Sequence, residues 1–250
     1  MTRFQITVLA ALVGCLAGLF LKNPLIVFLA AALFVIAFGL GIIFPQMKFF
    51  GPFICEGKPG SRAVALTFDD GPDPGSTVPL LDLLRERNVP AAFFCIGQRI
   101  DAHPEVVSRI VKEGHLIENH SYSHSNFTNL FTVPRLRREL ERTHAAIQKA
   151  GGLKPTCFRP PMGLSNPVIF QAARTLGLRV VGWTARGLDT RVMDTNRVVE
   201  RIIRRVKPGA IILLHDGNIP AERLVLTVKT LLDRVQGLGY EVVRLDRLLS

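Results

Sequence analysis

The chain lacks the cysteine patterns that build disulfide frameworks or structural zinc sites. It has only 4 cysteines in 250 residues, and none of them forms a CxxC pair. Cys15 lies in a long apolar run, whereas Cys95 and Cys157 lie in short, strand-like apolar runs. This spacing excludes a zinc site built from paired cysteines and favours buried free thiols over a disulfide framework.

Acidic residues are scarce beside basic ones. The chain has 20 Asp and Glu against 31 Lys and Arg, a formal net charge of +11. The basic residues concentrate at 135–138 and 201–207, both within helical patterns, so solvated helix faces account for them most simply. A sharper interpretation is contact with anionic lipid headgroups. No recognisable nucleic-acid-binding module accompanies the charge, so we expect no nucleic-acid partner.

Long apolar runs are present, and both lie near the N-terminus. Residues 4–21 and 25–44 are separated only by Lys22-Asn23-Pro24. Each run is close to the roughly 17–25 residues that a helix needs to cross the hydrocarbon core. A spanning segment must satisfy its own backbone, so we predict a transmembrane helical hairpin. The alternative is a cleaved signal peptide followed by one anchor, because Leu12-Val13-Gly14-Cys15 resembles a lipoprotein cleavage box.

The charges that flank the apolar runs bear on orientation. Arg3 precedes the hairpin and Lys48 follows it, whereas the loop carries Lys22 alone. Positive residues favour the cytoplasmic side, here by one or two charges, so we expect a multi-pass protein of a bacterial-type cell membrane with both flanks inside. We divide the chain into two transmembrane helices at 1–45, a Gly- and Pro-rich linker at 46–60 and one domain at 61–250.

Short apolar runs alternate with longer amphipathic ones after residue 61, which predicts an α/β fold. The alternation indicates a parallel sheet of about seven strands, closed or nearly closed into a barrel. The expected strands are 63–68, 91–96, 116–118, 156–159, 179–183, 210–214 and 241–244. The expected helices are 78–87, 104–112, 134–150, 167–176, 196–206 and 222–236.

Polar side chains follow five of these strands at the point where each ends. In such barrels the chemistry lies at the carboxyl ends of the strands, so these side chains are expected to converge there. They are Asp69, Asp70, His120, His124, Arg159, Asp189, His215 and Asp216.

Two motifs point to a metal. Asp69 and Asp70 repel each other when both are ionised, so a cation would hold them together; an Asp-Gly turn is the alternative. His120 and His124, four residues apart on one helical turn, would share a face and reach one ion, with surface polar residues as the alternative. With Asp70 they form a two-histidine, one-carboxylate set that leaves positions open, as catalytic sites do. Zinc is the first expectation, and other divalent metals suit the set too.

Successive motifs of the chain resemble, in order, those of the polysaccharide deacetylase family. This is the NodB-homology group of metal-dependent carbohydrate esterases, carbohydrate esterase family 4. The motifs are Thr67-Phe68-Asp69-Asp70-Gly71, His120-Ser121-Tyr122-Ser123-His124, Arg159-Pro160-Pro161-Met162-Gly163 and Leu213-Leu214-His215-Asp216. The resemblance covers 61–250 and implies a distorted (β/α)7 barrel. It also implies a hydrolase that removes an N-acyl group, usually acetyl, from an amino sugar.

The resemblance also implies roles for the polar residues at the strand ends. Asp70, His120 and His124 would hold the divalent metal, and Asp69 would be the general base toward water. Arg159 would pair with Asp69 and keep it ionised and oriented.

The remaining implied roles concern the leaving group and the pocket. His215 would protonate the leaving amine, and Asp189 would pair with His215. A backbone N–H near Met162 would hold the oxyanion, and Leu213 would line the acyl pocket. Met162 stands where the family often has Tyr, and Thr190 stands where the family usually has Trp. An aromatic wall is therefore absent or supplied by Trp183. Asp216 receives no catalytic role.

The short linker bears on the substrate. Even fully extended it reaches about 55 Å, at roughly 3.3–3.6 Å per residue, so the site should stay near the lipid headgroups. We therefore expect an N-acylated amino sugar close to the membrane, such as a lipid-linked precursor, with membrane lipid as a second partner. Deacetylation of peptidoglycan or an exported polysaccharide is the alternative. An inactive sugar-binding barrel and an amide hydrolase of small non-sugar compounds are others.

Overall fold

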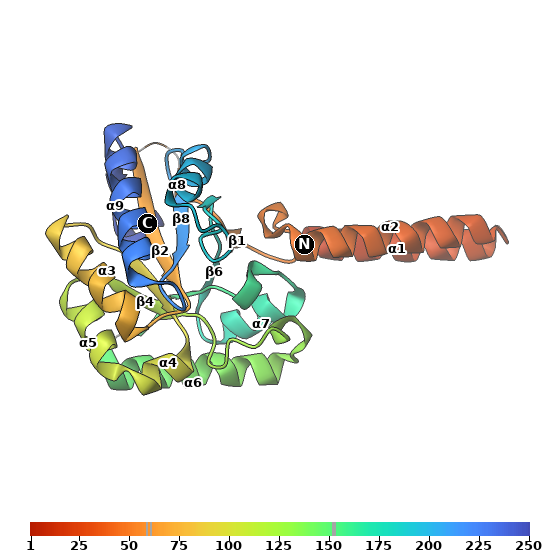
Figure 1. Cartoon of the computed structure of the whole chain (residues 1–250). Coiled ribbons are helices and arrows are strands. Elements are labelled where there is room, and N and C mark those ends of the chain that lie inside the picture. Colours follow the sequence, from red (N-terminus) through yellow and green to blue (C-terminus); the bar gives the residue numbers. More distant parts are fainter. Residues whose placement is uncertain (59, 61, 152–153) are drawn as a thin grey trace.

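A helical hairpin extends from one end of a mixed α/β body (Figure 1). The computed structural model describes residues 1–58, 60, 62–151 and 154–250, so the predicted domain start at Ser61 lies outside the described residues. The hairpin consists of α1 (Arg3–Phe20) and α2 (Pro24–Ile43). Thr2 and Gln5 form a capping box at the start of α1, and Asn23 caps α2 with Pro24 in its first turn.

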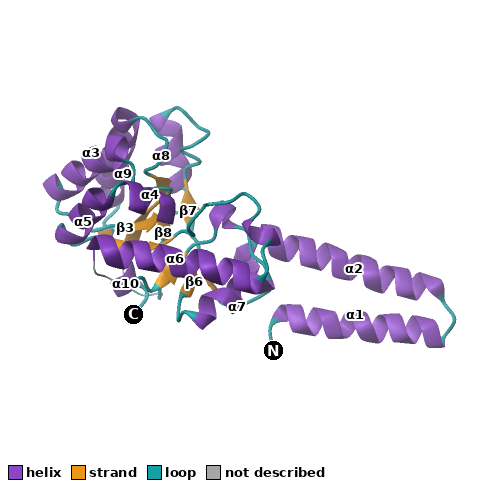
Figure 2. Ribbon diagram, turned by 90° about the horizontal axis from the view of Figure 1, so that it is seen from below, coloured by secondary structure: helices purple, strands orange, loops and turns teal. Residues whose placement is uncertain are grey.

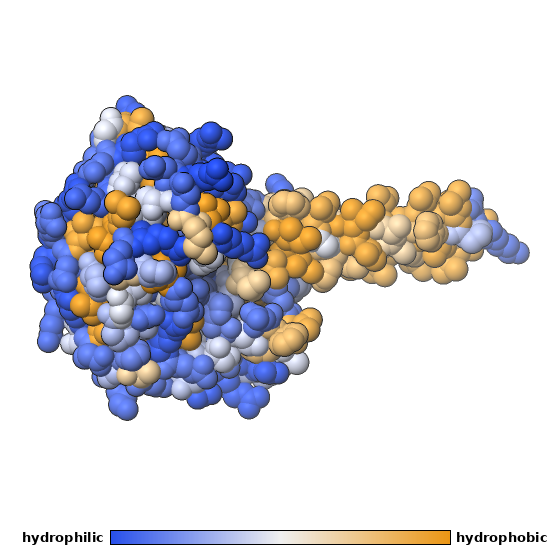
Figure 3. All heavy atoms as spheres, in the orientation of Figure 1, coloured by the Kyte–Doolittle hydropathy of each residue, from blue (hydrophilic) through white to orange (hydrophobic). Residues whose placement is uncertain are grey.

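Both hairpin helices are long and apolar enough to cross a membrane by length and composition. Only 6% of each 18-residue apolar window is buried. Figure 3 shows the hairpin as an apolar rod beside a largely hydrophilic body. The helices pack closely, since a Cβ on Gly14 would lie 2.9 Å from Cβ of Ala30.

In the described ranges, nine strands form one parallel sheet in the order β1-β6-β5-β4-β3-β2-β8-β7, and β9 pairs with the start of β2. Their bounds are β1 (Phe53–Ile54), β2 (Ala63–Asp69), β3 (Ala92–Cys95), β4 (Leu116–Asn119), β5 (Cys157–Phe158), β6 (Arg179–Val181), β7 (Ala185–Arg186), β8 (Ile211–His215) and β9 (Glu241–Val242).

The two edges of the sheet meet, which gives the distorted barrel that the sequence predicts. β6 and β7 lie on one short segment, and β6 pairs with β5 and β1 while β7 pairs with β8. An isolated antiparallel bridge between Glu56 and Ala210 links the chain after β1 to the start of β8. The closure is irregular because it depends on this bridge and on two-residue strands.

Helices cover the outside of the sheet (Figure 2). They are α3 (Pro74–Glu86), α4 (Gly97–Ala102), α5 (Pro104–Lys112), α6 (Val133–Gly151), α7 (Pro167–Thr175), α8 (Thr195–Ile203), α9 (Ala221–Gly237) and α10 (Leu245–Leu248). The six predicted helices are all present. α3 begins at Pro74 rather than at the predicted residue 78, because Asp73 caps it by accepting the Gly75 N–H at 2.9 Å.

Alternation along the strands sorts their side chains between the core and the barrel interior. Val64, Leu66 and Phe68 of β2 belong to the large core cluster beneath the helices. Ala65 belongs to a second cluster, with Phe94 and Ile211. Thr67 and Asp69 share the parity of Ala65, so they lie on the interior side near the carboxyl end of the strand.

Residues 46–58, which belong to the stretch 46–60 predicted as a linker, pack against the hairpin and the sheet. They include β1 and most of the short 3₁₀ turn η1 (Pro45–Met47). Their phenylalanines Phe49, Phe50 and Phe53 are buried, and the Phe4 N–H donates to the Phe49 carbonyl at 3.0 Å. Burial of these aromatic side chains stabilises a compact path. The body is therefore held directly at the base of the hairpin.

Candidate active site

The carboxyl ends of the strands bring the predicted polar residues together. Asp69 ends β2 and His215 ends β8, and the two are Cα partners across neighbouring strands. Arg159 follows β5, and its Nη1 donates to Oδ1 of Asp69 at 2.6 Å. Nε2 of His120, just after β4, lies 3.8 Å from Oδ2 of Asp69. Asp69 is thus the point at which these four strand ends converge.

Arg159 fixes the orientation of Asp69. Its side chain is fully buried, and it donates to Oγ1 of Thr67 at 3.0 Å and to the Gly182 carbonyl at 2.8 Å. The guanidinium carbon lies 4.0 Å from the centre of the Phe94 ring. A buried cation with a charge-assisted bond to a carboxylate holds that carboxylate in one position. One oxygen of Asp69 is taken by Arg159, which leaves Oδ2 on the side of His120.

Asp70, His120 and His124 converge on one point. Oδ1 of Asp70 lies 3.4 Å from Nε2 of His120 and 3.2 Å from Nε2 of His124. One ligand atom from each residue lies within 4.8 Å of the others. Nδ1 of His120 lies 2.7 Å from the Arg159 carbonyl, so it donates there and turns Nε2 toward Asp70. A second bond of this kind orients a metal-binding imidazole.

These three side chains fit a divalent cation. Burial lowers the pKa of His120, but the charges of Asp69 and Asp70 outweigh burial and raise it. Burial and the charge of His120 lower the pKa of His124. Two imidazole nitrogens that face one carboxylate oxygen need a proton or a cation between them. Nitrogen and carboxylate donors suit zinc and similar divalent metals.

The loop that carries the two histidines is not helical, so the prediction of one helical turn is wrong. Ser121 and His124 both have positive φ, of 67° and 47°. Asn119 accepts the Ser121 N–H at 2.9 Å, and Glu139 of α6 accepts both the N–H and the hydroxyl of Ser123 at 2.8 Å. These polar bonds fold the loop back on itself and bring the imidazole centres to 4.9 Å.

His215 and Asp189 form a pair on the β8 side of the site. Nδ1 of His215 lies 3.0 Å from Oδ1 of Asp189, and the His215 N–H donates to Oδ2 at 2.8 Å. Burial disfavours the protonated imidazole, but the hydrogen bond and charge of Asp189 outweigh it and raise the pKa of His215 to about 9. At neutral pH this imidazole therefore carries a proton that it can donate.

A family model described as "Polysaccharide deacetylase" matches residues 56–181 of the chain. The chain is 34% identical over 189 residues to a chitooligosaccharide deacetylase of Bradyrhizobium sp., covering 75% of this chain and 86% of the relative. The chain belongs to the polysaccharide deacetylase family.

Two further relatives show the range of this family. A peptidoglycan-N-acetylglucosamine deacetylase of Bacillus cereus is 33% identical over 190 residues, covering 75% of this chain and 88% of the relative. The crystal structure of a carbohydrate esterase family 4 pseudoenzyme from Bacillus anthracis superposes with a TM-score of 0.73 at 25% identity. The match covers 80% of this chain and 69% of the pseudoenzyme. Family membership therefore supports a deacetylase, while activity depends on the residues present.

The three residues predicted to line the pocket lie close in sequence to groups of the site. Met162 lies in the turn η3 (Pro161–Gly163), which follows Arg159, and its side chain is exposed. Trp183 lies between β6 and β7 and packs on this turn, since a Cβ on Gly163 would lie 2.0 Å from Cη2 of Trp183. Leu213 is buried on β8, with the strand parity of His215. Met162 and Leu213 thus lie three and two residues from Arg159 and His215, and Trp183 follows Gly182, whose carbonyl accepts from Arg159.

Asp216, just after β8, is fully buried and contacts the start of α3. Thr77 donates to its Oδ2 at 2.6 Å, and a Cβ on Gly71 would meet the same oxygen at 2.3 Å. Burial raises the pKa of Asp216 to about 7, against the hydrogen bond from Thr77. Asp216 thus ties the end of β8 to the turn that carries Asp70.

The sequence did not identify Glu139 and Glu118, whose carboxylates accept hydrogen bonds from segments next to the site residues. Glu139 is one of many charged residues on α6, so its pattern carries no signal. Glu118 is buried in β4 and accepts the N–H groups of Thr156 and Cys157 at 2.8 and 2.7 Å. The Glu118 carboxylate thus adds hydrogen bonds between β4 and β5, whose strand pairing consists of one residue pair, Asn119 with Phe158.

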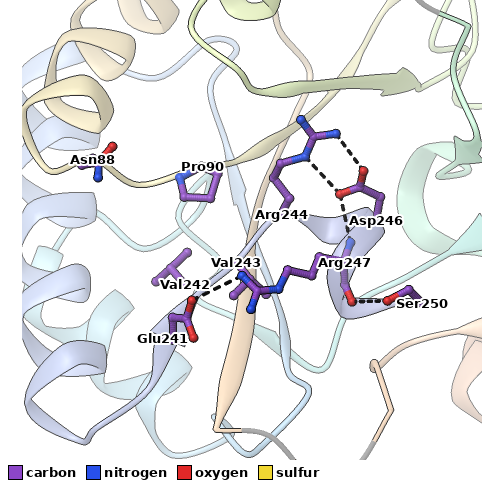
Figure 4. A pocket seen from close by; sticks show the side chains of 9 residues that line it. All are labelled: Asn88, Pro90, Glu241, Val242, Val243, Arg244, Asp246, Arg247 and Ser250. Carbon is purple, nitrogen blue, oxygen red and sulfur yellow. Dashed lines mark hydrogen bonds and ion pairs between the residues drawn. The ribbon is translucent and has the colours of Figure 1, made fainter.

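A separate hollow of about 550 Å³ lies at the opposite end of the sheet, beside β9. Figure 4 shows the side chains around it. Arg244 pairs with Asp246 at 2.7 Å, and Arg247 pairs with Glu241 at 3.6 Å. The charged groups that line this hollow thus neutralise one another, and the catalytic candidates lie elsewhere.

Proposed function

We propose that this protein is a metal-dependent hydrolase that removes N-acetyl, or another N-acyl group, from an amino sugar held close to the membrane. The observation that carries the proposal is the division of labour between neighbouring carboxylates. Asp69 is held by Arg159, whereas Asp70 faces two histidines. A general base and a metal ligand need these different surroundings.

The residues on each side of the substrate have complementary tasks. Asp70, His120 and His124 would hold a divalent metal, Zn²⁺ in the first instance. Such a metal polarises an amide carbonyl and acidifies water. Asp69 takes a proton from the attacking water as the C–O bond forms. His215 gives its proton to the nitrogen as the C–N bond breaks, so that carboxylate and free amine leave. Asp189 holds His215 in the tautomer and charge state for this step.

The remaining contacts concern substrate binding. Leu213 is apolar and close to His215 along β8, which suits an acyl methyl group. The turn at Met162 offers backbone N–H groups for the developing oxyanion. Trp183 supplies an apolar wall beside that turn, on which a sugar ring can stack.

The position of the hairpin supports a substrate near the membrane. The Ser165 N–H, three residues after Met162, donates to the carbonyl of Ile42 in the last turn of α2 at 3.2 Å. The segment that follows Met162 thus contacts the C-terminal end of the apolar helix α2. β2 and β8 run across the direction of the hairpin (Figure 1), so the barrel mouth opens sideways, along the plane of a membrane that holds the hairpin. A lipid-linked amino sugar fits this geometry.

Purified full-length protein in lipid, loaded with Zn²⁺ or another divalent metal, tests the proposal. Acetate release is compared among chitooligosaccharides, peptidoglycan fragments and a lipid-linked N-acetylated amino sugar. We expect release from the lipid-linked sugar to be the fastest. Preferential release from peptidoglycan fragments would instead support the second candidate, which the Bacillus cereus relative favours.

Two substitutions test the division of roles. Asp69→Asn should retain the metal and lower turnover by about a hundred- to ten-thousand-fold, the usual contribution of a general base. His120→Ala should lower metal affinity, as measured by competition with a chromogenic chelator. Loss of metal from Asp69→Asn would contradict the assignment.

An inactive sugar-binding barrel is a third candidate, because the family includes the pseudoenzyme from Bacillus anthracis. The proposed base, ligands and acid are all present here, which argues for activity. A protein that binds metal and N-acetylated sugars but releases no acetate would establish the inactive alternative.

A further inference from the structure

The turn after His124 presents large apolar side chains to the outside. Leu130 and Phe127 are 80% and 68% exposed, more than any other large apolar side chain in the described residues beyond 50. Phe127 directly precedes the 3₁₀ turn η2 (Thr128–Leu130), and Leu130 is its last residue. Two large apolar side chains exposed so close together on a globular body indicate an interaction surface.

Hydrogen bonds fix the backbone of the turn, so this exposure follows from the fold. Thr128, between the two exposed residues, and Phe131, directly after them, are buried. The Thr128 hydroxyl donates to the Ser125 carbonyl at 2.6 Å, and the Leu130 N–H donates to the Phe127 carbonyl at 2.8 Å. Phe127 and Leu130 therefore cannot turn inward without breaking these bonds.

The turn lies at the hairpin end of the body. Asn166 donates to the Asn129 carbonyl at 2.9 Å, and the neighbouring Ser165 N–H donates to the Ile42 carbonyl of α2 at 3.2 Å. Two hydrogen bonds and one peptide step thus connect the turn to the last turn of α2. Both ribbon views place the start of α6, which follows the turn, at the end nearest the hairpin (Figures 1 and 2). Figure 3 shows apolar atoms at this edge of the body.

Cationic side chains surround the same end. Arg135 lies over the Phe131 ring at 3.8 Å, close to the turn. Lys48 follows α2, and Arg3 begins α1 and donates to the Met47 carbonyl at 3.0 Å. Exposed aromatic and aliphatic groups beside Arg and Lys are typical of segments that lie in a membrane interface. Anionic headgroups complement this charge.

We propose that Phe127 and Leu130 insert into the lipid bilayer that holds the hairpin, as a second membrane contact of the body. The inference rests on the proposed membrane position of α1 and α2. The hairpin and the turn then fix the body at two points, which prevents rotation about the hairpin base. Since His124 begins the loop that leads into this turn, the bilayer also steadies one side of the active-site mouth.

Depth-dependent tryptophan quenching tests the proposal. Full-length protein is reconstituted in vesicles of phosphatidylcholine and phosphatidylglycerol whose acyl chains are brominated near the headgroups. The chain has 1 tryptophan, Trp183, so native protein supplies the background signal. Phe127→Trp probes the turn. Leu226→Trp is the matched control, because Leu226 is 54% exposed on α9, away from the hairpin. Phe28→Trp, in α2, reports on the hairpin itself.

We expect brominated lipid to quench the added fluorescence of Phe127→Trp and Phe28→Trp, and to leave that of Leu226→Trp unchanged. If Phe28→Trp is quenched but Phe127→Trp is not, the second membrane contact is wrong, whereas the membrane position of the hairpin still holds. If Phe28→Trp is not quenched either, the membrane hairpin itself is wrong. A Phe127→Trp signal that responds to chitooligosaccharide but not to brominated lipid would assign the turn to glycan binding and overturn the proposal.

Discussion

Asp69 and Asp70 are adjacent in the chain, yet their carboxylates meet different partners. Asp69 still belongs to β2 and takes the interior side of the strand, where Arg159 holds it. Asp70 lies beyond the strand with a φ of 73°, and this left-handed backbone turns its side chain toward the two histidines. One backbone torsion thus separates the proposed base from the proposed metal ligand.

The His215–Asp189 pair predicts the alkaline limb of the pH–rate profile. The protonated imidazole is the form that donates, so activity should fall as pH rises through the His215 pKa of about 9. Asp189→Asn removes the charge that raises this pKa, and burial then favours the neutral form. The alkaline limb should move down toward or below the ordinary imidazole value of about 6.5. Acetate release by metal-saturated protein across pH measures this shift.

Asp246→Asn supplies the control, because it makes the same chemical change at a surface pair with Arg244. Its pH profile should match that of the native protein. An alkaline limb that stays in place in Asp189→Asn would remove His215 from the role of general acid.

The loop between β4 and α6 positions two of the proposed metal ligands, His120 and His124. Its conformation depends on polar contacts to its surroundings rather than on regular hydrogen bonding. Glu139 reaches from α6 and takes two hydrogen bonds from Ser123, next to His124. The Gly97 N–H of α4 also donates to the Ser121 carbonyl at 3.0 Å. Two helices therefore hold the loop against β4.

Glu139 should act as a positioning residue for the metal site. Glu139→Ala leaves the Ser123 N–H without its acceptor, so the loop should loosen and metal affinity should fall by about 10- to 100-fold, as for other supporting contacts. Chelator competition measures the affinity. Glu141→Ala is the matched control, because Glu141 lies on the same helix and pairs with Arg137 at the surface. Equal affinities in the two variants would contradict a positioning role.

The longer elements followed from sequence pattern, whereas only some of the shortest did, among them the two-residue strands β5 and β9. All seven predicted strands and six predicted helices are present, since apolar runs and helical periodicity report burial directly. β1 and β7 are two residues each and were missed. Such strands are defined by what lies beside them: β1 pairs with β6 and β7 pairs with β8, far along the chain.

At the scale of the whole molecule, aromatic packing sets the body against the hairpin. Phe4 of α1 and Phe38 of α2 meet Phe50 with ring centres 5.3 and 5.2 Å apart, and Phe49 lies beside Phe50 at 4.9 Å. Gly51 continues this contact to the body, since a Cβ there would lie 2.6 Å from the Phe170 ring of α7. The hairpin and the body are thus joined by side-chain packing as well as by the chain.

The hairpin predicts that the N-terminus and the catalytic body lie on one side of the membrane. Reporters that are active on one side only, fused at either end and inserted at Asn23, should give equal signals at the two ends and the opposite signal in the loop. Because Arg3 and Lys48 flank the hairpin, we expect both ends to report the cytoplasm. An outward signal from both ends would move the proposed substrate to the outer face and favour peptidoglycan.

The sequence alone determined the family, the barrel and the set of polar residues at the strand ends, because strand periodicity and short motifs are local properties of the chain. Tertiary structure decided which partner each of these residues meets. Arg159 reaches Asp69 across 90 residues, and Glu139 reaches Ser123 from a helix whose sequence gives no hint of it. Packing also turned the apparent linker into part of the fold, since Phe49, Phe50 and Phe53 are buried by elements remote in sequence. Contacts between distant segments depend on the closed barrel, and no local pattern encodes them.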